Sequence, residues 1–439
     1  MYRQNVESST RFPRWAVVVV ALLLVSGFGG PAAAAAEDGG DAPLPWAEPA
    51  EVGIDPVGLE KLSAAMHELV DQGQLAGVQF AIARRGKLVH FESYGKRDLA
   101  SGAPVEDDTI FRIYSMTKPI AGVALMTLYD EGKFQLDDPV SKYIPELGGL
   151  RVAVADGPDG MPELADAERD MTIRDLMTHT GGLTYGIFGR SQVDLLYQKA
   201  SVLDREQDLE QLVAKLAKLP LLFQPGTRWN YSVSVDVQGR LVEVLSGKPF
   251  DQFLRERIFE PLGLKDTAFH VPPEKADRLA TLYVPNNEGV LQPQSNDDVL
   301  IPPKFHSGGG GLVSTAHDYL RFAQMLVNGG ELDGKRILKP ETVALMTRNH
   351  LPDGVTGVER IAPGNRFGLD FAVVTDPNPA MDHPRSKGEA WWFGVGGTWF
   401  GVHPEEELIV LGMIQLRGGR APFTARSSSK RLAYEALID

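Results

Sequence analysis

Segments with the pattern of β-strands lie near both ends of this 439-residue chain, and segments with the pattern of helices lie between them. Residues 78–83 and 87–92 are apolar runs on either side of Arg-Arg-Gly at 84–86, which predicts a β-hairpin. Residues 393–402 and 408–416 are two further predicted strands. The simplest assembly of such a chain is one antiparallel sheet built from both of its ends.

The middle of the chain is predicted to be mainly helical, and other helices flank the sheet. The fold class is therefore α/β (α+β), with residues 51–112 and 276–439 forming an α/β domain. Residues 113–275 form an inserted, mainly helical domain, and a functional site is expected between the two. The expected helices begin at Asp55-Pro56 or cover 120–130, 208–219, 235–245, 250–258, 316–327 and 426–437.

The first 36 residues have the order of an export signal. Three arginines precede the apolar run 15–28, and small residues follow at 32–36. The run is shorter than the roughly 20 residues that span a bilayer. We expect cleavage after residue 34, 35 or 36 and export to the periplasm or the outside; an uncleaved anchor is the alternative. Residues 37–50 are rich in Gly, Pro, Ala and acid, which predicts a linker.

The composition excludes several classes of function. Lys+Arg is 44 and Asp+Glu is 58, so the net charge of −14 disfavours nucleic acid and anionic membranes as partners. The chain has no cysteine, which excludes disulfides, thiol nucleophiles and cysteine-based metal sites. The nine histidines form no metal-binding motif, so neither a metal nor a cofactor is expected. The expected partner is a small molecule, and the sequence sets no oligomeric state.

Ser115 and Lys118 lie three residues apart, just before an apolar helical run, so their side chains are expected about one helical turn from each other. A serine hydroxyl is a weak nucleophile until a base takes its proton. A lysine becomes such a base only where burial or another cation lowers its pKa. On this spacing alone, a solvated helix face is the competing interpretation.

Three other segments accompany this pair: 176–183, 229–236 and 391–398. With these motifs in order, the chain resembles the serine β-lactamase and penicillin-binding-protein superfamily. The nearest branch is the class C-like group that includes the family VIII carboxylesterases. The resemblance runs from about Glu51 to the C-terminal helix. Supporting segments are 139–145, 223–227 and 261–267.

The resemblance implies a role for each matching residue. Ser115 matches the acylated nucleophile, and Lys118 matches the residue that activates it. Tyr231 matches the tyrosine that works with the lysine as general base and acid. The backbone amides of Ser115 and Val395 match the two donors that hold the oxyanion.

Two departures from the family pattern point to the substrate. The lactamase and peptidase pattern Tyr-x-Asn has Val233 at its third position here, and the lysine of Lys-Thr-Gly is replaced by Trp392. Loss of that cation and that amide favours neutral substrates over β-lactams and peptide carboxylates. The expected substrate pocket comprises Tyr114, Val233, Trp392, Gly394 and His306.

Two other features of the motifs are expected to be structural. His179 is predicted to tie down the turn 178–183, and the glycine tract 308–311 is predicted to be a turn near the pocket.

The sequence thus predicts an exported serine hydrolase with an acyl-enzyme at Ser115, acting as a carboxylesterase on short-acyl esters. Three alternatives remain open: a β-lactamase or D-alanyl-D-alanine carboxypeptidase, an acyltransferase (transesterase), and a non-catalytic cell-wall-binding module. Acyl length is expected to depend on the loops 183–192 and 285–302.

Overall fold

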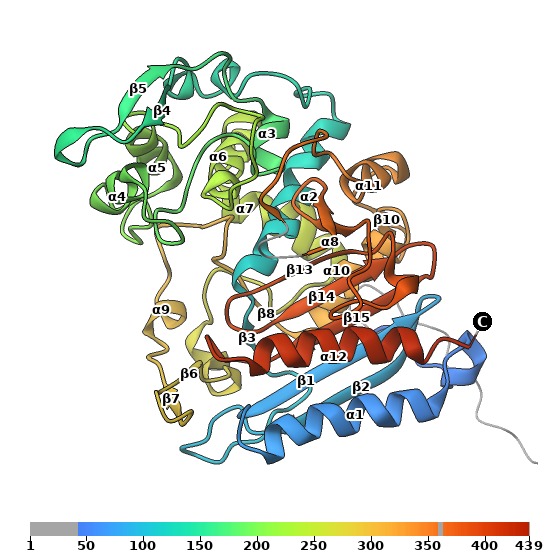
Figure 1. The fold of residues 1–439 in the computed structure, drawn as a ribbon. Coiled ribbons are helices and arrows are strands. Elements are labelled where there is room, and N and C mark those ends of the chain that lie inside the picture. Colours follow the sequence, from blue (N-terminus) through green and yellow to red (C-terminus); the bar gives the residue numbers. More distant parts are fainter. Residues whose placement is uncertain (1–42, 359–362, 439) are drawn as a thin grey trace, which may run out of the picture. The chain divides into compact units, whose positions relative to one another are not determined.

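One antiparallel sheet organises the computed structural model, which describes residues 43–358 and 363–438. Within these residues the sheet has seven strands in the order β11-β12-β13-β14-β15-β1-β2 (Figure 1). β1 pairs with β2 on one side and with β15 on the other, so both ends of the chain meet at its centre, as predicted. The strands are β1 (Gly77–Arg84), β2 (Lys87–Gly95), β11 (Asn365–Phe367), β12 (Ala372–Val374), β13 (Ala390–Phe393), β14 (Trp399–His403) and β15 (Leu408–Met413).

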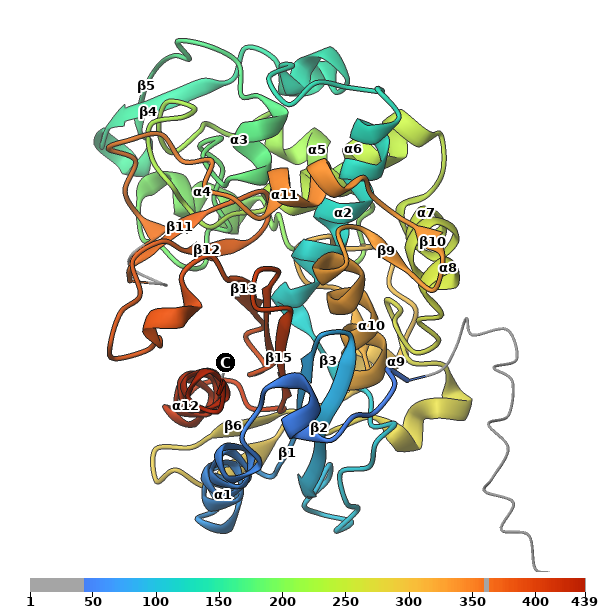
Figure 2. The ribbon, with the colours of Figure 1, turned by 90° about the vertical axis from the view of Figure 1, so that its right-hand side faces the viewer.

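Helices cover both faces of the sheet. Phe80 and Ile82 of β1 pack into the cluster that contains α1 and α12, whereas Ala81 packs into the main core on the other face. Because neighbouring residues of a strand point to opposite faces, a wholly buried strand needs cover on both sides. Figure 2, in which α12 is seen end-on, shows the sheet between α1 and α12 on one side and α10 on the other. These helices are α1 (Pro56–Asp71), α10 (Ala316–Val327) and α12 (Ala421–Glu435).

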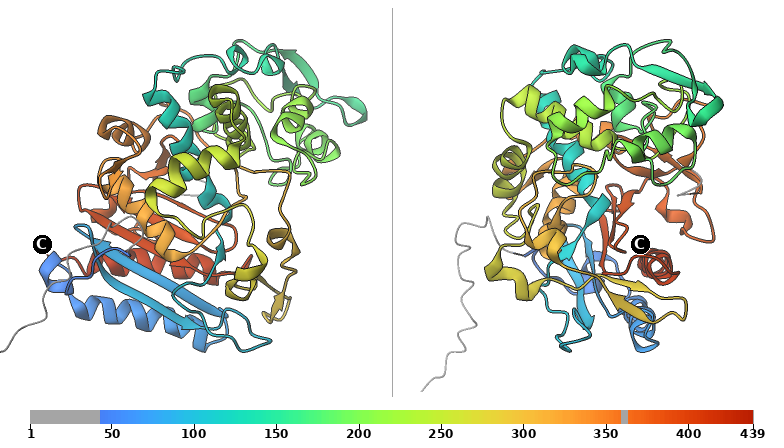
Figure 3. Two further views of the ribbon diagram at one scale, coloured as in Figure 1. Left: turned by 180° about the vertical axis from the view of Figure 1, so that it is seen from behind. Right: turned by 90° about the vertical axis from the view of Figure 1, so that its left-hand side faces the viewer.

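The helices of the middle segment gather at the end of the molecule away from α1 and α12 (Figure 3). α2 packs against α6, and every residue of α2 from Thr117 to Leu128 is buried. A surface helix has one apolar face, whereas a helix enclosed on all sides is apolar all round. α2 is of the second kind. The division of the chain at residues 112 and 275 stays a prediction. The helices are α2 (Thr117–Asp130), α3 (Ile173–Met177), α4 (Gln192–Lys199), α5 (Leu209–Leu216), α6 (Ser234–Ser246) and α7 (Phe250–Leu254).

The single strand predicted over 393–402 is wrong. β13 ends at Phe393 and β14 begins at Trp399, and the two strands form a hairpin in which these residues are partners. Gly397 has φ +93° and its N–H donates to the carbonyl of Gly394 at 2.9 Å. A positive φ is easy for glycine and closes the turn. Val395 therefore lies in a hairpin turn rather than within a strand.

Only part of the predicted N-terminal signal and linker falls within the described residues. The predicted export signal, residues 1–36, and the first residues of the predicted linker lie outside the described residues. Residues 43–50 are not a linker: Leu88 of β2 donates to the carbonyl of Pro45 at 2.8 Å and accepts from the N–H of Ala47 at 3.1 Å. The buried side chain of Leu44 anchors this stretch on the core. No helix in the described part of the chain is long and apolar enough to cross a membrane.

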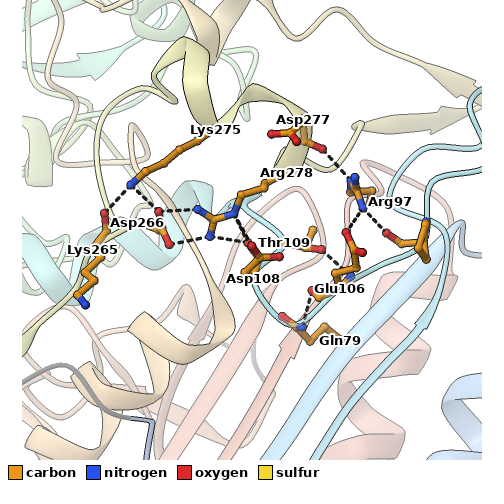
Figure 4. Close-up of polar contacts among 11 residues, drawn as sticks. Gln79, Arg97, Glu106, Asp108, Thr109, Lys265, Asp266, Lys275, Asp277 and Arg278 are labelled. Atoms are coloured by element: carbon orange, nitrogen blue, oxygen red, sulfur yellow. Dashed lines mark hydrogen bonds and ion pairs between the residues drawn. The ribbon is translucent and has the colours of Figure 1, made fainter.

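A polar network ties the end of the helical segment to the chain that leads into Ser115 (Figure 4). Arg278 donates to a carboxylate oxygen of Asp266 and to the carbonyl of Asp108, each at 2.7 Å. Lys275 donates to the other oxygen of Asp266 at 2.7 Å. Directly after this network, the N–H of Ile110 donates to the carbonyl of Arg278 at 2.9 Å. The network thus fixes the approach to β3 (Phe111–Arg112).

We predict a pH-dependent stability change for Asp318→Asn. Burial raises the pKa of Asp318 to about 6, although its carboxylate accepts hydrogen bonds from Asp266 N and Thr267 Oγ1 at 2.8 Å each. The folded state therefore binds this proton more tightly than the unfolded chain, so the stability contributed by Asp318 is full below its usual pKa and is lost as pH rises through 6. Relative to wild type, the free energy of unfolding of Asp318→Asn should rise between pH 4 and pH 7.5. Urea titrations at both pH values measure it, and a difference that does not change with pH would contradict the prediction.

Candidate active site

Ser115 lies in a tight turn, Tyr114–Met116, that leads directly into α2. Tyr114 has φ +42°, an uncommon conformation for an aromatic residue, and it turns the chain just before the serine. Lys118, in the first turn of α2, places Nζ 3.4 Å from Ser115 Oγ. Only 1% of Lys118 is exposed, so the pair is not the solvated helix face that the spacing alone allowed.

The glycine tract binds Lys118 directly. Nζ of Lys118 donates to the carbonyl of Gly309 at 2.6 Å. The Gly309 N–H donates to Asp236 Oδ1 at 3.0 Å, and Ser307 Oγ donates to the same oxygen at 2.5 Å. A Cβ on Gly309 would lie 2.6 Å from the hydroxyl of Tyr185, so only glycine fits here. The tract is therefore part of the site, whereas the sequence predicted a structural turn near it.

Asp236 is a residue of the site that sequence reasoning missed. Burial raises the pKa of its carboxyl, while the hydrogen bond from Ser307 and the charge of Lys118 act in the opposite direction. Among the described residues its Oδ2 has no hydrogen-bond partner. A buried carboxylate that holds the loop binding Lys118 costs desolvation free energy, which is typical of functional sites. Its position in the motif 229–236, five residues after Tyr231, was the available signal.

Tyr231 lies against Lys118 and is held by Trp392. Lys118 Nζ is 4.4 Å from the centroid of the Tyr231 ring. Trp392 Nε1 donates to the Tyr231 hydroxyl at 3.3 Å. An indole N–H is a donor only, so the phenol oxygen accepts this bond and its own proton stays available for another acceptor. Trp392 is buried; the sequence predicted it in the pocket wall and did not foresee this bond.

Two further aromatic rings complete the enclosure. The Tyr185 ring centroid is 5.3 Å from Lys118 Nζ, and burial raises the pKa of Tyr185 well above its usual value. The His179 ring is 4.9 Å from that of Tyr231, and its Nδ1 is 3.3 Å from Ser232 Oγ. Burial, with the charge of Lys118, lowers the pKa of His179 well below its usual value, so it is neutral at pH 7. The imidazole thus supports Tyr231 rather than the turn 178–183, since Nδ1 lies near Ser232 and Nε2 has no hydrogen-bond partner among the described residues.

The β13–β14 turn lies against the residues that precede Ser115. Thr398 Oγ1 donates to the carbonyl of Ile113 at 3.3 Å. A Cβ on Gly394 would lie 2.4 Å from the same carbonyl, and one on Gly396 would lie 2.8 Å from the Tyr114 ring. Glycine permits this close approach. The turn that contains Val395 therefore lies beside the turn that contains Ser115, and the oxyanion role of their amides stays a prediction.

The predicted pocket residues divide into two groups. Tyr114 lines a cavity of about 200 Å³ together with Gly310, and Gly394 packs beside Ile113. Val233 is fully buried and His306 lines a different cavity, and the pocket role of these two residues stays a prediction.

The two residues have different surroundings. Val233 stands immediately before α6 and belongs to the hydrophobic core. His306 lies in a different cavity, of about 620 Å³, where its ring is 4.8 Å from that of Phe269 and its Nδ1 is 3.4 Å from Asp251 Oδ1.

The family model for Beta-lactamase matches residues 62–435. The chain belongs to the β-lactamase family. The protein Rv1367c of Mycobacterium tuberculosis is 39% identical over 369 residues, which cover 81% of this chain and 90% of that protein. Esterase EstB of Burkholderia gladioli is 31% identical over 379 residues, which cover 80% of this chain and 90% of that protein.

A solved structure supports the same assignment. EstCE1, a hydrolase with promiscuous acyltransferase activity, superposes with a TM-score of 0.72 at 27% identity, over 85% of this chain and 98% of that one. The chain is therefore a serine hydrolase, and the resemblance to the family VIII carboxylesterase branch is confirmed.

We predict that Asp236→Asn lowers kcat by roughly 10- to 100-fold, the scale expected when a catalytic group is displaced. The asparagine amide would place a buried donor where Oδ2 now has no partner, and it would remove the negative charge near Lys118. Steady-state ester hydrolysis, with circular dichroism to confirm folding, measures the effect. Asp277→Asn, at an exposed aspartate outside the loops expected to shape the pocket, is the matched control, and a kcat for Asp236→Asn equal to that of this control would contradict the prediction.

We predict that Trp392→Phe lowers kcat by about tenfold, on the scale of one lost hydrogen bond to a reacting group. The matched control is the neighbouring Trp391→Phe. Trp391 is also buried and donates its Nε1 proton to Asn365 Oδ1 at 2.7 Å, away from Tyr231. Both variants should lose thermal stability, but only Trp392→Phe should lose kcat. Equal kcat values in the two variants would show that the bond to Tyr231 is dispensable.

Proposed function

We propose that this protein is an exported carboxylesterase that hydrolyses neutral, short-acyl esters through an acyl-enzyme at Ser115. The observation that carries the proposal is the buried cluster in which Lys118 Nζ lies 3.4 Å from Ser115 Oγ and over the Tyr231 ring. Relatives named as esterases, EstB and lovastatin esterase, support it. Export rests on the pattern of residues 1–36 alone.

In the first half-reaction, Ser115 Oγ attacks the ester carbonyl carbon while its proton passes to the Lys118–Tyr231 pair. The amides of Ser115 and Val395 hold the oxygen that becomes negative. The bond from carbon to the alcohol oxygen then breaks, and the alcohol leaves with the proton from the pair. In the second half-reaction, water attacks the acyl carbon, the pair takes its proton and returns one to Ser115, and the acid is released.

The residues around this cluster favour an ester over a β-lactam. Val233 is buried and apolar, so no side-chain amide reaches a substrate from that position. Trp392 occupies the position of the family lysine and donates to Tyr231, so that position offers an anionic substrate no cation. A site of this kind loses affinity for carboxylate-bearing substrates and keeps its acyl-transfer chemistry.

Acyl transfer to an alcohol is the second candidate. Among the similar proteins are acyltransferase calJ and EstCE1, a hydrolase with promiscuous acyltransferase activity. Transfer and hydrolysis share the acyl-enzyme and differ only in whether an alcohol or water attacks it. Another relative is named as a putative D-alanyl-D-alanine carboxypeptidase, so the test below also includes that reaction.

The test is turnover of p-nitrophenyl butyrate by wild type, Ser115→Ala and the surface control Ser427→Ala. Loss of the nucleophile should lower kcat by at least roughly 1,000-fold, and the control should match wild type. Inactive wild type would refute the esterase proposal. Hydrolysis of a chromogenic cephalosporin or of a D-alanyl dipeptide would then indicate a lactamase or peptidase. Binding of muropeptides without labelling by a serine reagent would indicate a binding module.

A further inference from the structure

Two large apolar side chains are exposed next to the active site. Ile187 and Phe188, in the loop between α3 and α4, are 58% and 66% exposed. Single exposed apolar residues are common on protein surfaces, but two adjacent ones at a site indicate a ligand contact. They lie in the segment 183–192, which the sequence predicted to set acyl length; their position beside Tyr231 points to the alcohol side instead.

Hydrogen bonds fix the loop just before Ile187 and Phe188, so the exposure of these two side chains follows from the fold. Gly186 has φ +76°, its N–H donates to Thr184 Oγ1 at 3.0 Å, and its carbonyl accepts from Gln198 Nε2 at 2.5 Å. Thr184 Oγ1 in turn donates to the buried Asp194 at 2.6 Å. Gly186 is therefore fixed from both sides, just before the two apolar residues.

Phe188 continues the aromatic enclosure of Lys118 outward. Its ring centroid lies 5.6 Å from that of Tyr185, edge to face, and 6.0 Å from that of Tyr231. Lys118 Nζ lies over the same two rings, 5.3 Å from the Tyr185 centroid and 4.4 Å from the Tyr231 centroid. Phe188 thus borders the residues proposed to transfer protons, while most of its surface remains open to a ligand.

The proton-transfer geometry decides which part of an ester meets Phe188. The leaving oxygen takes its proton from the Lys118–Tyr231 pair, so it must come within hydrogen-bond reach of that pair. The alcohol group attached to this oxygen therefore lies on the side of Tyr231. The acyl chain is the other substituent on the carbonyl carbon and extends away from it.

We propose that Phe188, with Ile187, forms the wall of the subsite for the alcohol part of the ester, and that the substrates are esters of apolar alkyl or aryl alcohols. This inference rests on the proposed esterase function and extends it to the substrate class. The same wall receives an acceptor alcohol in acyl transfer. There the bond from Ser115 Oγ to the acyl carbon breaks, the acceptor oxygen bonds to that carbon, and its proton returns to Ser115 through the pair.

The test compares methyl butyrate with benzyl butyrate, which share an acyl group, in wild type, Phe188→Ala and Phe188→Leu. In Phe188→Ala, kcat/KM for benzyl butyrate should fall roughly tenfold, the scale of one apolar pocket contact, with less than about a twofold change for methyl butyrate. Phe188→Leu keeps an apolar wall and should retain most of the preference. The matched control is Ile438→Ala, an apolar residue 62% exposed after α12 and outside both loops expected to shape the substrate pocket.

Two further measurements separate the alcohol side from the acyl side. The rate ratios among p-nitrophenyl acetate, butyrate and octanoate should be the same in Phe188→Ala as in wild type. The ratio of benzyl butyrate formed to butyrate released, with benzyl alcohol as acceptor, should fall roughly tenfold. Equal losses for methyl and benzyl esters, or a changed acyl preference, would overturn the alcohol-side assignment. If wild type hydrolysed neither methyl butyrate nor benzyl butyrate, the proposed esterase function would be overturned, and this inference with it.

Discussion

The active-site region depends on one hydrogen bond, from Lys118 Nζ to the carbonyl of Gly309 at 2.6 Å. A fully buried amino group is costly unless it has partners. The turn before α2 supplies only the Ser115 hydroxyl, at 3.4 Å. The other partners come from far along the chain: the glycine tract gives a carbonyl, and Tyr185 and Tyr231 give ring faces. The middle and the end of the chain must therefore fold back on α2 before the site exists.

The sheet built from both ends makes this return possible. Gln415 follows β15, and its side chain accepts from the N–H of Arg112 at 3.2 Å and donates to the carbonyl of Arg112 at 3.0 Å. The β13–β14 turn contacts the next residue, Ile113, through Thr398. Residues some 300 positions apart thus fix the chain immediately before Ser115. The turn with Val395 and the turn with Ser115 form one structural unit for this reason.

The sequence predicted those features that depend on residues close together in the chain. The hairpin at 78–92, α10 and the motif around Ser115 were readable because their periodicity, turn residues and spacing are local. The roles of Tyr185, Asp236 and Phe188 were not readable, since each arises from contacts between segments tens of residues apart. Val233 and His306 were assigned to the pocket from their places in the sequence, which does not reveal that Val233 is fully buried and that His306 lines a separate cavity beside Asp251. The sequence does not show which contacts require Gly394 and Gly396. In the structure, Gly394 lies against the carbonyl of Ile113 and Gly396 lies against the Tyr114 ring.

Trp392 links substrate choice to proton transfer. In the family pattern a lysine at this position helps to bind a carboxylate of the substrate; here the indole donates to Tyr231 instead. That bond orients the phenol oxygen, while neutral His179 packs on the same ring without adding a charge. A lysine at position 392 would bring a second cation toward Lys118 and would lack the indole's fixed donor. Loss of the anion-binding cation and support of the tyrosine are thus two effects of one residue, and both support the proposed preference for neutral esters.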